Sequence, residues 1–390
     1  MVGLAWTGLG CGSEASDEET SVEVARADLR SFPASIGFTD VRDMVSDGEN
    51  LWVLDRAAPF ITRVSLDGAD VQRFGNQGEG PSELGRPVAL RVTLGHVDVW
   101  DVGLGKRASF FLDGTLDAVH RLSDERSGWI RADIERVSHV DPWRVRARGD
   151  ITYFVRLPYG MTQPLDFGRG ELVRASVDLE PDGSVVRFED YLPRDERGVG
   201  QFPAVPLWDV CPSGMAIWNP RDGRVEWIDE RGVLIHSVRV ASPGVRITDE
   251  GILTFLRAMA DHELGSGVEV PAEVFRARLR EVRPVFGQLA TDFVDLRCAL
   301  DAAVWLRHFD LEADPLGADD TWLRVPTDGE ALRVRFPSNF EPFLFAAEEI
   351  VGVVQTPDGD RLGSWRASPF LPHVPPTECP SCESDSSSPS

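Results

Sequence analysis

The apolar positions of the chain fall into short runs that return at a constant spacing. One unit contains three runs of strand length, joined by polar turns and an Asp-Gly or Arg-Gly hairpin. Asp55 and Asp101 end the second run of the first two copies. The spacing between these two residues equals the spacing between the hairpin glycines Gly68 and Gly114. Clear copies of the unit occur in residues 50–74, 97–122 and 216–240. This constancy predicts a repeated small antiparallel sheet.

Weaker copies occupy residues 172–188, 304–336 and 343–365, each around a further hairpin signal. A period of about 40–50 residues with three or four strands is typical of propeller blades, which cover their faces by stacking around an axis. The sequence therefore predicts an all-β fold, a six-bladed β-propeller over residues 21–371. The last copy is one strand short. We expect residues 21–29 to supply that strand to blade six and so close the ring.

The apolar period changes between blades four and five. Ile252 and Phe255, and later Phe275 and Leu279, recur at helical spacing, and Pro271 suits the start of the second segment. Residues 248–284 are therefore predicted to form a helical hairpin insert. Two placements stay open: a cap packed on the side of the propeller, or a lid over its central opening.

Charge and hydropathy exclude two classes of function. The 390 residues carry 64 Asp and Glu against 40 Lys and Arg, a net charge of -24, which repels phosphate backbones, so nucleic acid is not an expected partner. The chain has no apolar run of the roughly 18–20 residues that a membrane-spanning helix needs. Contact with a membrane is expected only through a lipid anchor.

The N-terminus resembles a bacterial lipoprotein signal. Small and apolar residues lead to Cys11, and a polar, acidic stretch follows it. In such signals the cysteine is acylated and the polar stretch acts as a tether, here ending near residue 20. Cys11 is therefore the predicted lipidation site, and the cell envelope, on its periplasmic or extracellular side, the predicted location. The alternative is a cytosolic N-terminus with a chance cysteine, since no basic residue precedes Cys11.

The other four cysteines are not expected to form a framework. Cys211 and Cys298 lie inside apolar patterns, whereas Cys379 and Cys382 form a CxxC in a Ser- and Pro-rich tail, residues 372–390, that is predicted to be disordered. Only His373 is near that pair, which is too few ligands for a structural zinc site. We therefore expect no metal site in the tail. We also expect the protein to be a monomer.

The segment from Phe74 to Gly114 resembles the NHL repeat. A Gly-rich crossover, a Pro before an apolar strand, an acidic strand end, an Arg in the next strand and a closing turn glycine occupy the expected places: Gly75, Gly78, Gly80, Leu84, Pro87, Asp101, Arg107, Phe110 and Gly114. With the helical insert and the lipoprotein-like start, most of the chain resembles six-bladed propeller lipoproteins of bacterial envelopes. The resemblance implies architecture more than activity.

Six-bladed lactonases of the gluconolactonase and regucalcin kind are similar in architecture and hold a divalent metal in the channel with Glu, Asn and Asp. Their ligand set cannot be placed on this chain, which has no G-x-S-x-G or H-E-x-x-H motif either. Asp55, Asp101 and Asn219 end the second strand of their blades. We expect them to bind loop backbone, the alternative being a calcium site on the axis.

Basic residues near the loops after the second strands are the predicted ligand-binding residues: Arg56, Lys106, Arg107, Arg221 and Arg224. If they converge on one face, they favour an anionic protein, peptide or glycan. Alternatively they pair with local acids such as Glu79, Glu83 and Asp222.

Two functional hypotheses follow from the sequence. The first is an envelope-anchored binding scaffold without a cofactor, favoured because no catalytic set is visible. The second is a metal-dependent lactonase- or esterase-like hydrolase, with calcium in the channel. A cytosolic scaffold is a third reading, and it requires that the N-terminal signal be spurious.

Overall fold

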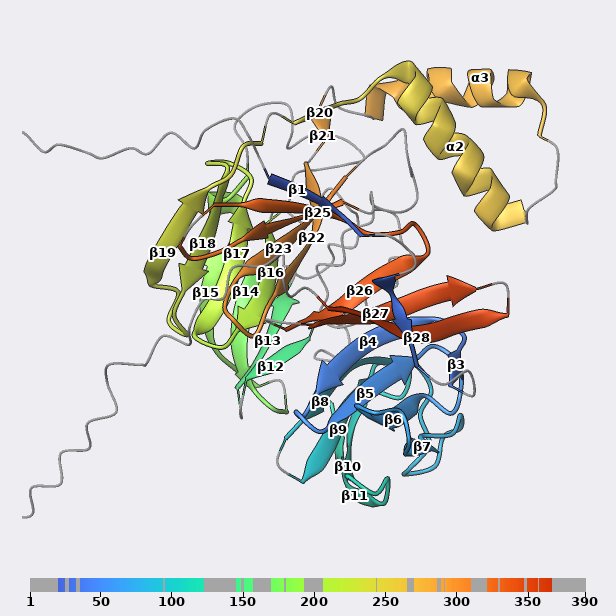
Figure 1. Ribbon diagram of the computed structural model, residues 1–390, viewed down its shortest axis with the longest axis vertical. Helices are drawn as coiled ribbons and strands as arrows, with labels where there is room; N and C mark the ends of the chain where they lie inside the picture. The colour runs from blue at the N-terminus through green and yellow to red at the C-terminus, as the bar shows by residue number, and fades with distance from the viewer. Residues whose placement is uncertain are drawn as a thin grey trace, which may run out of the picture.

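The computed structural model describes residues 20–24, 28–32, 36–93, 95–122, 145–148, 151–156, 170–178, 180–192, 206–242, 244–264, 270–285, 289–290, 292–309, 321–328, 330–346, 349–356 and 358–366. The blades are six small, mainly antiparallel sheets arranged as a six-bladed β-propeller, with a helical hairpin between blades four and five (Figure 1). The predicted fold class is confirmed. Cys11 and the tail cysteines lie outside the described residues.

Blades one to four each contain four strands in chain order, from the axis outward. Blade one is β4 (Val41–Ser46), β5 (Asn50–Asp55), β6 (Ile61–Ser65) and β7 (Val71–Phe74). Blade two is β8 (Pro87–Val92), β9 (His96–Asp101), β10 (Lys106–Phe111) and β11 (Leu116–Arg121). Blade three is β12 (Arg146–Arg148), β13 (Ile151–Arg156), β14 (Glu171–Ser176) and β15 (Pro181–Arg187), followed by the short helix η3 (Phe188–Asp190). Blade four is β16 (Leu207–Cys211), β17 (Gly214–Asn219), β18 (Arg224–Ile228) and β19 (Leu234–Arg239).

The last two blades recruit N-terminal strands. Blade five is β22 (Phe293–Cys298), β23 (Val304–His308), β24 (Thr321–Val325) and β25 (Leu332–Arg335), and β1 (Thr20–Glu23) adds to its outer edge. Blade six is β26 (Phe340–Phe345), β27 (Glu349–Thr356) and β28 (Gly359–Arg366), whose outer neighbours are β2 (Arg30–Ser31) and β3 (Gly37–Phe38).

The prediction that residues 21–29 complete blade six is wrong. β1 instead pairs in parallel with β25 of blade five, with Val22 opposite Val334 and Glu23 opposite Arg335. The register follows from packing, because Val24 is buried in the apolar cluster between blades five and six. The ring is closed by the next residues along the chain, since β2 and β3 pair with β28.

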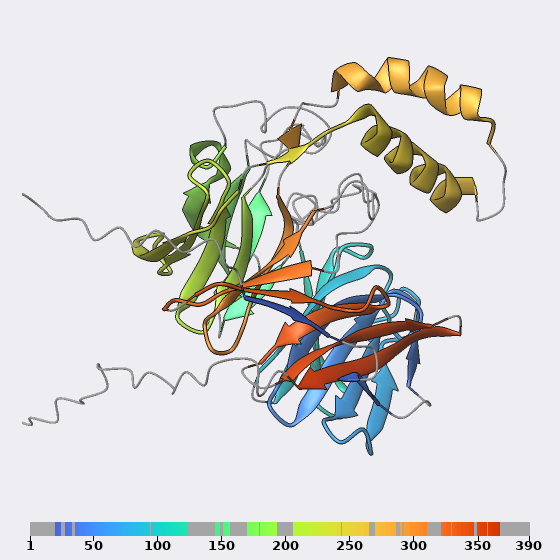
Figure 2. The ribbon, with the colours of Figure 1, turned by 45° about the horizontal axis from the view of Figure 1, so that its top comes forward.

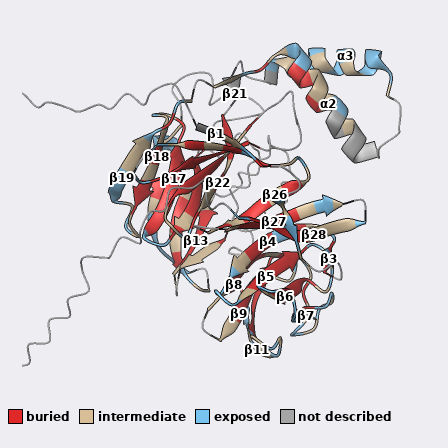
Figure 3. Cartoon of the chain, in the orientation of Figure 1, coloured by how far each residue is buried: buried red, intermediate tan, exposed pale blue. Residues whose placement is uncertain are grey.

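Six apolar clusters alternate with the six blades. Each joins the facing sides of neighbouring blades, and together they run around the ring. Trp52, Trp100, Trp218, Trp305 and Trp322 are among the largest fully buried side chains, as expected if tryptophan packs between blades. The buried positions lie between the sheets, and the outer strands are the most exposed (Figure 3). Burial of apolar surface between blades therefore holds the propeller together.

A disulfide between Cys211 and Cys298 joins blades four and five, contrary to the expectation that the cysteines form no framework. The two cysteines are 87 residues apart in sequence, and their Cα atoms are 5.2 Å apart in space. Cys211 ends the inner strand β16 and Cys298 ends the inner strand β22. The ring brings these two strands side by side, so the pairing depends on closure and is not visible in the apolar pattern.

The predicted helical hairpin is confirmed. It contains α2 (Asp249–Leu264), α3 (Ala272–Val282) and the short helix η5 (Arg283–Val285), and β20 (Val245–Arg246) pairs with β21 (Leu289–Ala290) at its base. Ile252 and Phe255 of α2 pack with Val294 and Phe309 of blade five. Beyond this base the hairpin stands out from the propeller in both views (Figures 1 and 2). Within the described part of the chain, no helix combines the length and hydropathy of a membrane span.

Candidate functional site

The innermost strand of each blade faces the axis, and consecutive inner strands contact one another around the ring. Arg146 starts the inner strand of blade three. Its Nη1 donates to Oδ1 of Asp43 in blade one at 3.0 Å, and its Nε donates to Oδ1 of Asp209 in blade four at 3.1 Å. Blades one and four lie opposite each other in a ring of six. One guanidinium therefore bridges the axis.

Both carboxylates of this axial bridge are also fixed by backbone groups of other blades. Asp43 accepts the N–H of Leu90 in blade two at 3.2 Å, and Asp209 accepts the N–H of Cys298 in blade five at 2.9 Å. The side chain of Asp43 is 3% exposed, that of Asp209 11% and that of Arg146 17%. The axial bridge thus ties five blades together through buried charged hydrogen bonds.

The axial bridge does not fit a divalent cation. A calcium ion needs about six to eight oxygen ligands, and the two inner-strand carboxylates already hold an internal cation, the guanidinium of Arg146. Among the described residues no three His, Cys, Asp or Glu side chains are grouped so as to hold a metal ion. The charge that a channel metal would supply is here supplied by an arginine.

The strand-end residues bind loop backbone, as the sequence predicted. Asp55 accepts the N–H groups of Thr39, Asp40 and Ala57 at 2.9–3.2 Å. Asp101 accepts those of Gly85, Arg86 and Leu104 at 2.5–3.1 Å, and Asn219 Oδ1 accepts those of Arg221 and Asp222 at 3.1–3.2 Å. In blades one and two each carboxylate fastens the turn after its own strand to the segment that leads into the inner strand. They are architectural groups.

Lys106, one of the predicted ligand-binding residues, is buried under the crossover between blades one and two. Its Nζ donates to the carbonyl oxygens of Gly80, Pro81 and Glu83 at 2.5–3.1 Å. An ammonium group has three donors, so these contacts use all of them. Burial lowers the pKa of Lys106, although Asp101 and Glu83 attract its charge. The residue holds the glycine-rich crossover in place.

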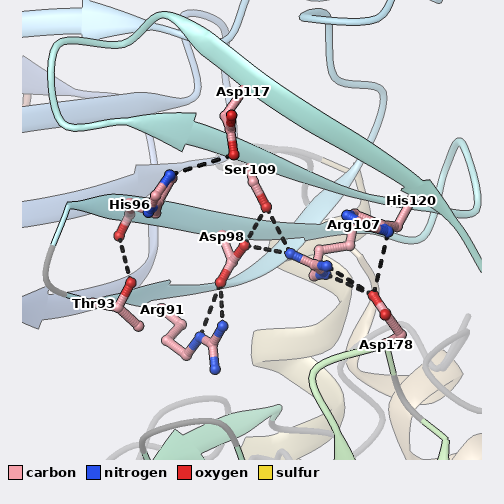
Figure 4. Close-up of polar contacts among 9 residues, drawn as sticks. All are labelled: Arg91, Thr93, His96, Asp98, Arg107, Ser109, Asp117, His120 and Asp178. Carbon is pink, nitrogen blue, oxygen red and sulfur yellow. Dashed lines mark hydrogen bonds and ion pairs between the residues drawn. The ribbon is translucent and has the colours of Figure 1, made fainter.

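Arg107, the next residue, points to the opposite side of blade two, toward blade three (Figure 4). Its guanidinium donates to Asp98 and Ser109 of its own blade and, through Nη2, to Oδ1 of Asp178 in blade three at 2.8 Å. His120 lies 3.8 Å from the same Asp178 oxygen. Arg107 therefore links two blades.

Asp98 is the centre of this blade-two network (Figure 4). It accepts hydrogen bonds from Arg91, Arg107 and the hydroxyl of Ser109, and it is 3% exposed. Burial alone would raise the pKa of Asp98, but the hydrogen bonds from Ser109 and Arg91, together with the charges of Arg91 and Arg107, hold it below its usual range. A carboxylate with two arginines stays ionised, so it is not poised for proton transfer near neutral pH.

The other three predicted residues lie on two blades: Arg56 follows β5 of blade one, and Arg221 and Arg224 lie in the β17–β18 turn and at the start of β18 in blade four. Arg56 is exposed, 3.5 Å from Asp40; Arg221 donates to the carbonyl of Asp190; Arg224 donates to Ser237. The contacts of the described residues do not join the five basic side chains into one cluster. Anion binding by these residues stays a prediction, and Lys106 and Arg107 are both engaged internally.

One carboxyl group sits in an unfavourable setting where blades six and one meet. Burial, with the charges of Asp40 and Glu341 nearby, raises the pKa of Asp360 to about 6, against the lowering effect of the Val41 N–H. The folded-state pKa is thus above the unfolded value, so the charged form destabilises the fold above about pH 6, and this cost disappears as the pH falls toward 4.

Replacing Asp360 by asparagine is therefore expected to stabilise the protein at about pH 8, by roughly 1 kcal/mol after solvent screening is taken into account. The gain should vanish below about pH 4, where the wild-type carboxyl is protonated in both states. Denaturant unfolding at both pH values measures it. Asp358→Asn is the matched control, because Asp358 lies just before β28, the strand that contains Asp360, and its side chain is 85% exposed. An equal gain in this control would contradict the explanation.

Comparison with known proteins supports the fold and goes no further. No protein-family model matches the sequence, and no curated protein matches it. Among solved structures, a member of the DUF4221 family from Bacteroides vulgatus is 8% identical, with 86% of this chain and 95% of that chain covered and a TM-score of 0.52. A putative exported protein from Bacteroides fragilis is 10% identical, with 88% and 98% covered and a TM-score of 0.51.

Other solved structures similar to the chain differ in function. Streptogramin B lyase is 14% identical over 90% of this chain and 89% of its own, with a TM-score of 0.42, and a calcium-binding regucalcin from Agrobacterium tumefaciens is 9% identical over 89% and 95%, with a TM-score of 0.43. At identities of 8–14%, the solved structures support the fold alone, so function has to be argued from the site.

Proposed function

We propose that this chain is a binding propeller of the bacterial cell envelope, which presents its outer surface to a protein, peptide or glycan and carries no reaction in its channel. The axial bridge carries this proposal. Arg146 occupies the two inner-strand carboxylates, Asp43 and Asp209, that a channel hydrolase would keep free for a metal and substrate. A partner would then be met by loops and strand edges, where propellers place variable residues.

An assay of purified protein against lactones and aryl esters, with and without calcium, tests this proposal. We expect no hydrolysis above that of the Asp43→Asn/Asp209→Asn variant, which lacks both axial carboxylates. Calcium-dependent turnover that the wild type has and this variant loses would favour the lactonase-like alternative.

Envelope location is supported by the disulfide between blades four and five. Disulfides persist in oxidising compartments such as the periplasm and are rare in the cytosol. Cys211 of the Cys211–Cys298 disulfide is only 2% exposed. The disulfide is therefore a structural crosslink rather than a surface thiol pair. This agrees with the lipoprotein-like start of the chain and disfavours the cytosolic reading.

Anchoring is tested at Cys11. In a Gram-negative host the protein is expected to enter the membrane fraction and to incorporate labelled palmitate, because the thiol of a lipoprotein signal is acylated. Cys11→Ser should lose the label, whereas Cys379→Ser should keep it. Label that persists in the Cys11 variant would rule out this anchor.

A further inference from the structure

Three consecutive exposed apolar residues lie at the start of β19, the outer strand of blade four, with Val233 just before the strand and Leu234 and Ile235 in it. Val233 is 59% exposed, Leu234 55% and Ile235 57%. β19 lies at the rim of the propeller in Figure 1, and its exposed surface is visible in Figure 3. No strand among the described residues pairs with its outer edge. Proteins usually blunt such an edge with charge, so a rim strand that begins with Leu-Ile directly after an exposed Val is unusual.

The backbone of β19 is directed for strand pairing. Val240, just after the strand, donates its N–H to the carbonyl of Gly223 at 2.9 Å, so it faces inward. Because backbone groups alternate along a strand, those of Arg239 and Ser237 face outward. The open edge therefore offers a ladder of donors and acceptors next to an apolar patch.

The same chain already adds a strand to the equivalent edge of the next blade. β1 pairs in parallel with β25, and Val22 and Glu23 lie opposite Val334 and Arg335. Arg335 pairs with the first residue of the third strand of its blade, as Arg239 does in blade four. The Val-Arg pair that receives β1 thus recurs on β19 as Val238-Arg239.

We infer that the β19 edge binds an extended segment of a partner protein, added in parallel, with a Val-Glu pair opposite Val238-Arg239 and apolar residues over Val233–Ile235. Arg239, at the end of β19, favours the glutamate of the partner segment, and the apolar residues Val233–Ile235 favour its apolar residues. The inference rests on the proposed role as a binding protein and names its partner class. Its test does not involve the axis, so its failure would leave the calcium and hydrolysis tests standing.

The probe is a fluorescent peptide, Val-Thr-Ile-Thr-Ser-Val-Glu-Val, whose last five residues copy residues 20–24. Titrated with the full-length wild-type protein, it should bind saturably below about 1 mM. Leu234→Ser/Ile235→Ser and Arg239→Glu should each weaken binding by about tenfold. Val119→Ser is the matched control, because Val119 is an exposed apolar residue on the outer strand of blade two, and it should bind as the wild type does.

Reversing both charges tests whether Arg239 contacts the glutamate of the peptide directly. A peptide with Lys in place of Glu should bind the Arg239→Glu variant better than the wild type. Absence of saturable binding to the wild type overturns the inference. A second outcome also overturns it: the Arg335→Glu variant loses binding while the β19 variants bind as the wild type does. The peptide would then be replacing β1 on blade five.

Discussion

Replacement of Arg146 by alanine is expected to lower the free energy of unfolding by about 3–5 kcal/mol, the usual cost of removing one partner from a buried ion pair. The guanidinium is the only side chain seen to bridge Asp43 and Asp209 among the described contacts, and its loss leaves two buried carboxylates that face each other across the axis. For a propeller of this size the melting temperature should fall by about 4–8 °C. Denaturant unfolding and calorimetry measure the two quantities.

Arg148 provides the matched control, because it lies two residues further along β12. Arg148 forms an ion pair with Glu230, and the side chains of the two residues are 38% and 42% exposed, respectively. Arg148→Ala should therefore lower the free energy of unfolding by no more than about 0.5 kcal/mol. Equal stability of the two alanine variants would contradict the claim that the axial bridge holds the blades together.

Removal of the disulfide is the second large effect that we expect. Cys211→Ser/Cys298→Ser should lose about 2–4 kcal/mol of stability, because the crosslink closes a long loop and restricts the unfolded chain. Thermal unfolding with and without reductant measures the loss. The wild type should fall to the stability of the variant when reduced, and the variant should not respond.

Peptide mapping provides the independent check on the disulfide. Under non-reducing conditions the peptide that contains Cys211 should be linked to the one that contains Cys298. A wild type whose stability is unchanged by reductant, and whose two peptides run separately, would contradict the crosslink and remove its support for an oxidising compartment.

The fold could be predicted because its signals are local. The second, third and fourth strands of a blade follow one another through short turns, so Asp55 and Asp101 recur at a fixed place and Gly68 and Gly114 mark the same hairpin. The hydrogen bonds of Asp55 and Asp101 to loop backbone could be predicted from their position at the end of a strand alone. The helical insert was visible for the same reason, as a change of apolar period within one stretch of chain.

The axial bridge could not be predicted because the inner strands have no fixed pattern. Asp43 follows a bulge in β4, and Arg146 begins a strand of three residues that lies outside the repeated frame. Contacts between these residues and Asp209 exist only once the ring is closed. The same applies to Cys211 and Cys298, which pair because β16 and β22 become neighbours.

The strand at the N-terminus shows how packing decides register. Val22 and Val24 alternate with polar residues and would suit the edge of any blade. Burial of Val24 beside Trp365 and Val334, in the cluster between blades five and six, selects β25. A sequence pattern of period two identifies a strand but not its partner.

The most direct test of the central claim, that an arginine rather than a metal holds the axis, is a calorimetric titration of calcium into metal-free wild-type protein. We predict no saturable binding and the same melting temperature in calcium and in chelator, because Asp43 and Asp209 are already paired with Arg146. Stoichiometric calcium binding that disappears in Asp43→Asn/Asp209→Asn would contradict the account.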